Sequence, residues 1–458
     1  MKTRCKEQSL KGRRVPGFLA GCFFFAAAVL AAQDFGFGFG GEDTGDFSGQ
    51  AAGTFAVSIG GEIKASISGF VEDFADGADH TQLGDIFSGK LRLSAETSRA
   101  AGVINLNLSP SASPATSSAA SPLTIDEAYL RVYLGRLDLE GGLRKLSWGR
   151  ADSLGPLDVV NPLDYSDVSN LSDMAGLKIA RPLIHASLLV GQFSKLEGIF
   201  VPNFEPVRFA DTGHWAPAQL AMISQIPPAN VSHPDTATLD YAQAGLRFTT
   251  TIGGAADIGL QYYYGRLTTP ALILIMGGTP PSMTITGASF AYNPYHQIGA
   301  DWAQVIAGFN LRAEAAANIT YDTAGDDAGV YNPSLAWSLG FDRDLFWGIN
   351  LNAQCNETIR LFDGKIKSPL DIEAGSDITT TRITAALSKR LLRDELEIKA
   401  AAIWETESGA CLIMPAITWT KDDISAELSG GAFAGNREGL FGQFRDNSFI
   451  KAGVRYSF

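Results

Sequence analysis

Runs of alternating apolar and polar residues recur along most of the chain. In the clearest run, from Phe55 to Val71, apolar side chains take most odd positions, and serine, lysine and glutamate take most of the even ones. A period of two places successive side chains on opposite faces of a β-strand, whereas an amphipathic helix repeats every 3.6 residues. The pattern therefore predicts strands with one apolar and one polar face. The same alternation returns in residues 87–96, 127–134, 309–321, 395–405 and 423–428.

These predicted strands are long for a soluble protein, in which about five to six residues is usual. A tilted strand needs about 9 to 11 residues to cross a bilayer. Aromatic residues also gather near strand ends, as in Tyr262-Tyr263-Tyr264, Phe346-Trp347 and Trp404, which is typical of the aromatic girdles of membrane barrels. Soluble β-sandwiches and β-helices alternate too, but length and aromatic placement favour an all-β, transmembrane antiparallel β-barrel.

The connections between the predicted strands alternate between short and long. Gly135-Arg136 and Gly253-Gly254 are tight turns, whereas Gly149–Asp173 and Val201–Asp240 are long segments rich in turn-forming residues. Short periplasmic turns and longer external loops are typical of bacterial barrels. Allowing about 25 residues per strand and connection, residues 54–458 form a barrel of about 16 strands, within a range of about 14 to 18.

The N-terminal segment has the features of a secretory signal peptide. Six basic residues precede an apolar run from Phe18 to Ala32 that ends in small residues, and this order is that of a cleaved export signal. The run is interrupted by Gly21 and is short for a spanning helix. We expect residues 1–32 to be removed and residues 33–53, rich in glycine and phenylalanine, to form a flexible leader.

An alternative processing route is lipidation at Cys22. Leu19-Ala20-Gly21-Cys22 is similar to a lipoprotein processing box. The apolar core continues for ten residues beyond the cysteine, however, and this favours ordinary signal-peptide cleavage.

The C-terminus carries a second export feature. The last eight residues match the outer-membrane assembly signal at its four defined positions, Lys451, Gly453, Tyr456 and Phe458. The alternate residues from Ile450 to Phe458 form an apolar strand face that ends on an aromatic residue. This pattern predicts recognition by the barrel assembly machinery and residence in the outer membrane of a diderm bacterium.

The charge balance is acidic. The chain carries a net charge of −13, and loss of residues 1–32 removes six basic side chains and one acidic side chain, which leaves −13 − 5 = −18. Nucleic acid is therefore an unsuitable partner. Charges on the polar strand faces have mixed sign, and we assign them to the lumen because an Arg or Lys facing mid-bilayer lipid costs about 2–4 kcal/mol. These presumed lumen residues are Lys64, Lys90, Arg92, Arg131, Glu127, Arg312 and Glu314.

Two cysteines remain in the mature chain, Cys355 and Cys411. Their separation in sequence gives no framework from which to argue a disulfide. Cys355 shares its parity with Ile349, Leu351 and Ala353, and this predicts that it lies on the lipid face.

Several segments resemble a family of large, porin-like and functionally uncharacterised outer-membrane barrels. The resemblance rests on Trp148–Asp152, Asp158–Asp164, Phe200–Pro206 with Trp215, and Phe444–Phe449. It implies the fold and the location, but no activity and no ligand residues.

The segment from Trp148 to Asp164 has two interpretations. Gly155-Pro156 and Asn161-Pro162 are turn signals, and short acidic side chains can bond nearby backbone amides, which favours an ordinary packed external loop. In the alternative, the loop folds inward and its polar side chains narrow a pore. The candidate constriction residues are Asp152, Asp158, Asn161 and Asp164, with Asp167 beside them.

Catalytic signals are weak. The five histidines, His80, His185, His214, His233 and His296, are scattered without metal-ligand spacing, and no Gly-x-Ser-x-Gly elbow occurs. We therefore expect no cofactor, no metal and no enzyme activity. The favoured function is passive diffusion of small hydrophilic solutes or ions, with a modest cation preference from the net charge. A surface anchor whose long loops bind a host or matrix partner is the alternative, and a barrel-embedded hydrolase is the third; the oligomeric state stays open.

The terminal strand yields the first prediction. Deleting Phe458, or replacing Tyr456 and Phe458 with alanine, should lower the amount of barrel inserted in the outer membrane, because the strand loses its aromatic recognition positions. Heat-modifiable migration of the membrane fraction measures insertion. Unchanged surface levels would contradict the assignment.

Overall fold

The computed structural model describes residues 55–72, 87–109, 122–152, 155–223, 226–278 and 284–458. The expected signal peptide (1–32), the leader (33–53) and Cys22 lie outside these residues, as does His80. None of the helices in the described ranges combines the length and apolar character needed to cross a bilayer.

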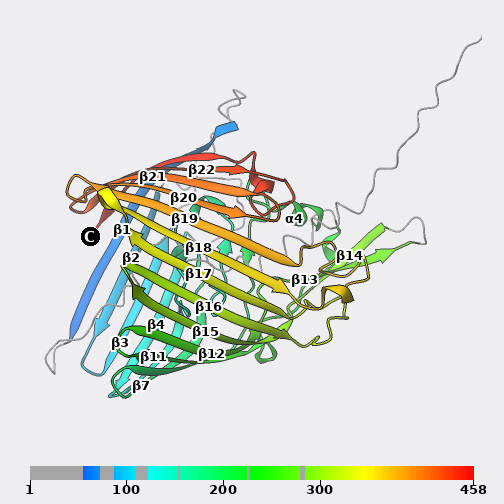
Figure 1. The fold of residues 1–458 in the computed structure, drawn as a ribbon, viewed down its shortest axis with the longest axis horizontal. Coiled ribbons are helices and arrows are strands. Elements are labelled where there is room, and N and C mark those ends of the chain that lie inside the picture. Colours follow the sequence, from blue (N-terminus) through cyan, green and yellow to red (C-terminus); the bar gives the residue numbers. More distant parts are fainter. Residues whose placement is uncertain (1–54, 73–86, 110–121, 153–154, 224–225, 279–283) are drawn as a thin grey trace, which may run out of the picture.

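Eighteen antiparallel strands form one closed sheet (Figure 1). In order round the ring they are β1 (Ala56–Phe70), β2 (Phe87–Glu96), β3 (Ala100–Leu108), β4 (Leu123–Leu134), β5 (Leu137–Arg144), β7 (Arg181–Val190), β8 (Ser194–Val201), β11 (Gln243–Ile252), β12 (Ala256–Arg266), β15 (Pro294–Ile306), β16 (Phe309–Thr320), β17 (Ser334–Asp344), β18 (Ile349–Arg360), β19 (Thr379–Leu391), β20 (Leu396–Glu405), β21 (Cys411–Lys421), β22 (Ile424–Ala434) and β23 (Phe449–Ser457). The ring closes where β23 pairs with β1, from Glu62 opposite Ser457 to Phe70 opposite Phe449. The predicted all-β antiparallel barrel is thus confirmed.

The strand count exceeds the estimate of about 16 and stands at the upper end of its range. The allowance of about 25 residues per strand was too generous. Four strands, β19 to β22, fit into the 56 residues from Thr379 to Ala434, because only Asp422-Asp423 separates β21 from β22.

The two faces of the barrel wall differ as the alternation predicts. In β15, Gln297 is 1% exposed on the inner face, whereas its neighbour Ile298 is 58% exposed on the outer face. Cys355 pairs with Leu339 of β17 and Ile383 of β19, both of which are exposed apolar residues. The predicted outward parity of Cys355 therefore agrees with the register.

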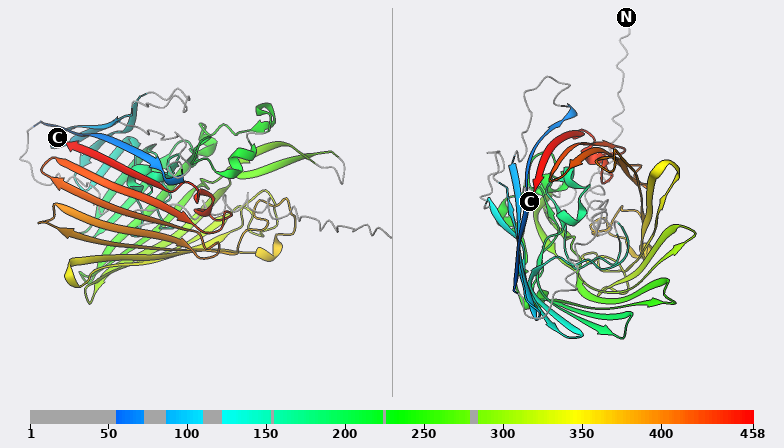
Figure 2. Two further views of the ribbon diagram at one scale, coloured as in Figure 1. Left: turned by 90° about the horizontal axis from the view of Figure 1, so that it is seen from above. Right: turned by 90° about the vertical axis from the view of Figure 1, so that its left-hand side faces the viewer.

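The two ends of the barrel also differ (Figures 1 and 2). At the short-turn end, where β23 ends, hairpins are tight; Gly253 and Gly254 both have positive φ, which two-residue turns require and glycine tolerates best. The long connections leave the other, long-loop end. These long connections contain five short strands: β6 (Asp164–Tyr165), β9 (Arg208–Phe209), β10 (Val231–Ser232), β13 (Ala271–Gly277) and β14 (Thr284–Ala291). They also contain the helices α3 (Met174–Leu177) and α4 (Ala218–Ile223) and the 3₁₀ turns η1 (Val168–Asn170), η2 (Pro228–Asn230), η3 (Leu239–Tyr241), η5 (Asp363–Lys365) and η6 (Gly442–Phe444). A further 3₁₀ turn, η4 (Phe346–Gly348), lies at the short-turn end.

The register of β18 yields the second prediction. In a Cys411→Ser protein, Cys355 should resist a bulky water-soluble maleimide in membranes, because its side chain is on the outer face. The matched control is Lys90→Cys in a cysteine-free mature chain, since the Lys90 side chain is 59% exposed on the inner face. Equal labelling of the two thiols, read by mass shift, would show that the register of β18 is wrong.

Candidate functional site: a loop inside the barrel

The connection between β5 and β7, residues 145–180, enters the ring of strands, and we call it the inner loop. Viewed along the barrel axis, segments coloured teal to green lie inside the ring (Figure 2). The inner loop contacts β4 near its start, and it also reaches β12, β15, β16 and β18, which do not pair with β5 or β7. The loop therefore bridges across the lumen.

One carboxylate organises the first half of the inner loop. Glu314 of β16 is 3% exposed and accepts hydrogen bonds from the backbone N–H groups of Arg150, Ala151 (2.7 Å) and Leu157 (3.3 Å). Gly149 and Gly155 allow this approach, because a Cβ at either position would overlap the Glu314 carboxylate. Gly149 also has a φ of +93°, a conformation that glycine tolerates best.

A second contact is ionic. The Arg150 guanidinium lies 3.1 Å from Asp257 of β12 and 3.0 Å from Asp301 of β15. Asp301 also pairs with Arg247 of β11 at 2.6 Å. The loop thus supplies one of the two cations that compensate the Asp301 carboxylate, whose side chain is fully buried. Buried charge is tolerated only when it is paired and hydrogen-bonded.

Two wall amides complete the attachment. Gln261 of β12 donates to the carbonyl of Leu157, and Gln297 of β15 donates to the carbonyl of Pro156, each at 2.9 Å. The two glutamines also bond each other at 2.8 Å. Irregular backbone inside a barrel needs partners for its polar groups, and these side chains provide them.

The candidate constriction carboxylates are mostly paired. Asp152 binds Arg312 and accepts from Asn352 of β18 at 2.5 Å. Asp158 is buried, binds Lys178 and accepts from the backbone of Trp148. Three of these side chains therefore carry compensated charge, the third being Asp164, which binds Arg208 at 2.8 Å.

Asn161 and Asp167 have local structural roles. Asn161 accepts from the backbone of Leu146 at 2.8 Å and donates to the carbonyls of Arg144 and Ile179, so it ties together the two ends of the inner loop. Asp167 caps η1 by accepting from Ser169 at 2.9 Å. The turn chemistry inferred from the sequence is present, and the segment contacts the inner face of the wall.

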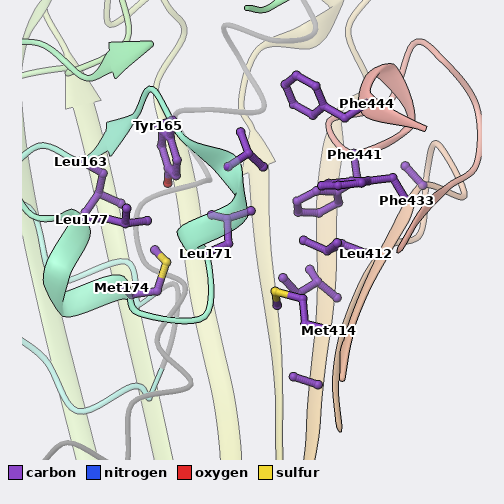
Figure 3. Packing of buried hydrophobic residues seen from close by; sticks show 14 of the residues in the cluster. Leu163, Tyr165, Leu171, Met174, Leu177, Leu412, Met414, Phe433, Phe441 and Phe444 are labelled. Carbon is purple, nitrogen blue, oxygen red and sulfur yellow. The ribbon is translucent and has the colours of Figure 1, made fainter. Parts of the chain in front are cut away.

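The second half of the inner loop packs through apolar side chains (Figure 3). Leu163, Leu171 and Met174 lie opposite Leu412 and Phe433 in one buried cluster. Leu412 is fully buried on the inner face of β21. A buried leucine of this kind contributes about 1.5–3 kcal/mol. This part of the wall therefore holds the loop by packing, whereas β12, β15 and β16 hold it by polar contacts.

The remaining presumed lumen charges lie on the inner wall, where Lys90 and Arg131 form ion pairs. Lys90 lies 3.3 Å from Glu62, and Arg131 lies 2.5 Å from Glu140. Glu127 accepts from Asn105 at 2.9 Å. Lys64 and Arg92 share the inner parity of these residues, since Lys64 is opposite Arg455 in β23 and Arg92 alternates with Lys90 in β2.

The residues of the terminal assembly pattern lie at the barrel seam. Lys451 points inward and donates to Asn170 of the inner loop at 2.8 Å. Gly453 pairs with Ser66 of β1. Tyr456 and Phe458 are exposed, their rings stack, and Phe458 exchanges backbone hydrogen bonds with Gly61.

Sequence reasoning did not identify the wall residues that receive the loop: Asp257, Gln261, Asp301 and Gln297. Their alternation marks them as polar-face residues of strands, and nothing local shows which wall the loop reaches. His185 hydrogen-bonds Glu140 and Glu197. Within the described ranges, no three His, Cys, Asp or Glu side chains are grouped closely enough to hold a metal ion.

The connection between β18 and β19, residues 361–378, lies at the long-loop end and contains a buried glutamate, Glu373. Glu373 accepts from the backbone N–H of Asn332 at 2.7 Å and lies 3.8 Å from Arg360. Arg360 also donates to Asp363 at 2.5 Å. Burial raises the pKa of Glu373 to about 7, against the opposing effects of the Asn332 N–H and Arg360.

Comparison with known proteins identifies solved structures with a similar fold. No model of a protein family matches the sequence, and no curated protein is similar enough to count as a relative. Among solved structures, OccAB4 of Acinetobacter baumannii is 8% identical over 88% of this chain and 98% of its own, with a TM-score of 0.51. The likeness is one of fold. Wzi, an outer membrane protein of Escherichia coli described as a carbohydrate-binding β-barrel (10% identity, 87% and 84% coverage, TM-score 0.44), and a variant of Rh. blastica porin (12%, 88% and 100%, 0.40) are more weakly similar and do not enter the argument.

The Glu373 carboxyl yields the third prediction. An unfolded glutamate titrates near about 4.3, so between that pH and about 7 the folded state holds the extra proton and stability falls as pH rises. The Tm of the wild-type barrel should therefore drop between pH 5 and pH 8 by more than that of Glu373→Gln. Glu438→Gln, at an exposed position, is the control. Parallel Tm profiles for wild type and Glu373→Gln would contradict the assignment.

Proposed function

We propose that this chain is an outer-membrane diffusion channel of a diderm bacterium, in which the inner loop narrows the path of small hydrophilic solutes or ions. The observation that carries the proposal is the attachment of the inner loop to two separate parts of the inner wall of a closed 18-stranded barrel, by polar contacts to β16 and by apolar packing on β20 and β21. Barrels of about 16 to 18 strands are wide enough to leave an aqueous lumen. A loop held across such a lumen sets its narrowest part.

The chemistry of the two faces supports a membrane setting. Exposed residues on the outer face are mainly apolar, as Ile298 illustrates, and the inner face carries paired charges such as Lys90 with Glu62. The signal peptide expected from the sequence and the C-terminal aromatic pattern are consistent with the proposed export and with recognition by the barrel assembly machinery. Lipid around the barrel and solutes inside it are the partners that this proposal requires.

The charge distribution bears on selectivity. The mature chain is acidic, with a net charge of −18 from the arithmetic above, which favours cations at the mouth. Three of the four candidate loop carboxylates, however, have cationic partners: Asp152, Asp158 and Asp164. Salt limits the reach of the remaining field to about 8 Å at physiological ionic strength. The proposed cation preference is therefore modest.

The surface-anchor alternative has one specific observation in its favour. β10, β13 and β14 form a separate three-stranded sheet, and the β13–β14 hairpin projects beyond the long-loop end of the barrel (Figures 1 and 2). Ile273 and Ile275 are exposed on it. A barrel that serves only as an anchor needs no conducting lumen, so conductance separates the two functions.

The fourth prediction concerns conductance. The purified mature chain should form ion-conducting channels in planar bilayers. In Glu314→Ala, the mean single-channel current should be higher and should fluctuate more than in the wild type. The substitution removes three hydrogen bonds to the loop backbone, each worth about 0.5–1.5 kcal/mol.

The matched control for this experiment is Glu427→Ala. Glu427 is on β22 and bonds Ser429 at 2.8 Å, not the inner loop. It should leave the current unchanged. Absence of conductance in the wild type would favour the anchor, whereas wild-type current in Glu314→Ala would remove the inner loop from the proposed constriction.

A further inference from the structure

A cavity that is open to solvent lies on the long-loop side of the inner loop. Gly155, Pro156 and Val159 of the inner loop form one side of it, and strands β15 to β19 form the other. The connections 321–333 and 361–378 contribute Asn332 and Glu373. A solute that entered the barrel from the long-loop end would meet this cavity beside the inner loop.

Many of the lining side chains are neutral and polar. Amides come from Gln297, Asn318, Asn332 and Asn356, and hydroxyls come from residues such as Thr320 and Thr358. Several amides are already fixed by protein contacts; for example, Gln297 donates to Asn318 at 2.9 Å. An amide presents both donors and acceptors, so this wall can bond hydroxyl groups in either sense.

Two buried side chains on this wall have unused hydrogen-bonding groups. Thr320 is 2% exposed and its Oγ1 has no hydrogen-bond partner among the described residues; Asn356 is 8% exposed and its Nδ2 likewise has none. The Asn356 Oδ1 does accept from Gln354 at 2.7 Å, which fixes the amide orientation. A buried polar group without a partner costs about 1–3 kcal/mol, and a bound hydroxyl would remove this cost.

The charged lining residues do not favour an anion. Arg360 is bound by Asp363 and Glu373, and Arg382 lies 3.2 Å from Glu405. The other charged lining residues are the acids Glu357 and Asp377. With its arginines compensated, the cavity has no excess of positive charge to attract a carboxylate or phosphate.

Aromatic and aliphatic groups complete the lining. Tyr295 and Tyr331 are buried, and the Tyr331 hydroxyl donates to the carbonyl of Pro270 at 3.0 Å, so its position is fixed. Val159 and Leu267 add apolar surface. Buried aromatic side chains supply rigid apolar area, which suits the C–H faces of a sugar ring while amides bind its hydroxyls.

We infer that this cavity binds a neutral polyhydroxylated solute, a mono- or small oligosaccharide, held by Thr320 and Asn356. The inference rests on the proposed channel function, because it names the class of solute that would pause beside the inner loop.

Binding is tested on the full mature chain in detergent by isothermal titration calorimetry, which needs no membrane and no conductance. Glucose, sucrose and maltotriose are the neutral test solutes; gluconate and choline are the anionic and cationic comparisons. At least one neutral sugar should give saturable heat, and both ions should give none. Saturable binding of gluconate or choline alone, or of nothing, would overturn the inference.

The site is located with Thr320→Val, which keeps the side-chain shape and breaks no hydrogen bond within the described protein. It should weaken sugar binding about two- to tenfold, as expected for loss of one hydrogen bond. Asn356→Leu should weaken it at least as much. Thr249→Val, on the inner wall of β11 outside this cavity, should leave it unchanged.

The outcomes separate the inference from the proposed function. Conducting channels without sugar binding would overturn the inference and leave the channel standing. Sugar binding without conductance would overturn the channel and leave a carbohydrate site. Equal affinities for Thr320→Val and wild type, with both folded by heat-modifiable migration, would show that the sugar binds elsewhere.

Discussion

The pairing of the last strand with the first determines how every other part of this molecule is arranged. In hydrocarbon an unpaired backbone N–H or C=O costs several kcal/mol, so a sheet that spans a membrane must have no edge. Nine residue pairs join β1 to β23, from Glu62–Ser457 to Phe70–Phe449. Closure separates an outer face from an inner one, and the period of two then assigns each side chain to one of these two faces.

Closure also creates an interior that this chain fills by two kinds of chemistry. Towards β12, β15 and β16, the inner loop has its backbone groups bonded by Glu314, Gln261 and Gln297. Towards β20 and β21, it packs Leu171 and Met174 against Ile403 and Leu412. Polar contacts fix orientation, because they are directional, while the apolar cluster contributes stability that depends mainly on buried area. Because the inner loop is attached by both kinds of contact, it gives the lumen one defined shape.

The inner wall carries both compensated charges and polar groups without a protein partner. Around the inner loop, buried charges are compensated, as Asp301 is by Arg150 and Arg247. In the cavity, Thr320 and Asn356 keep unused hydrogen-bonding groups although they are buried. Groups that serve only the fold are normally satisfied within it. The proposed binding of a hydroxylated solute by Thr320 and Asn356 would link the proposed channel to a class of cargo.

The sequence by itself determined the strands, their two faces and the antiparallel barrel, because alternation is a local property and closure follows from the lipid environment. It placed Glu314 and Arg312 on the inner face and Cys355 on the outer face for the same reason. The number of strands, eighteen, could not be derived without the actual lengths of the turns between them. The sequence could not decide where the inner loop goes: Asp158 and Asp164 have the same turn chemistry outside a barrel as inside one. The meeting of Arg150 with Asp301 joins residues 151 positions apart, and so does not arise from any local pattern. Even the apolar inner positions Ile403 and Leu412, which depart from the alternation, became interpretable only once the tertiary structure brought the loop against them.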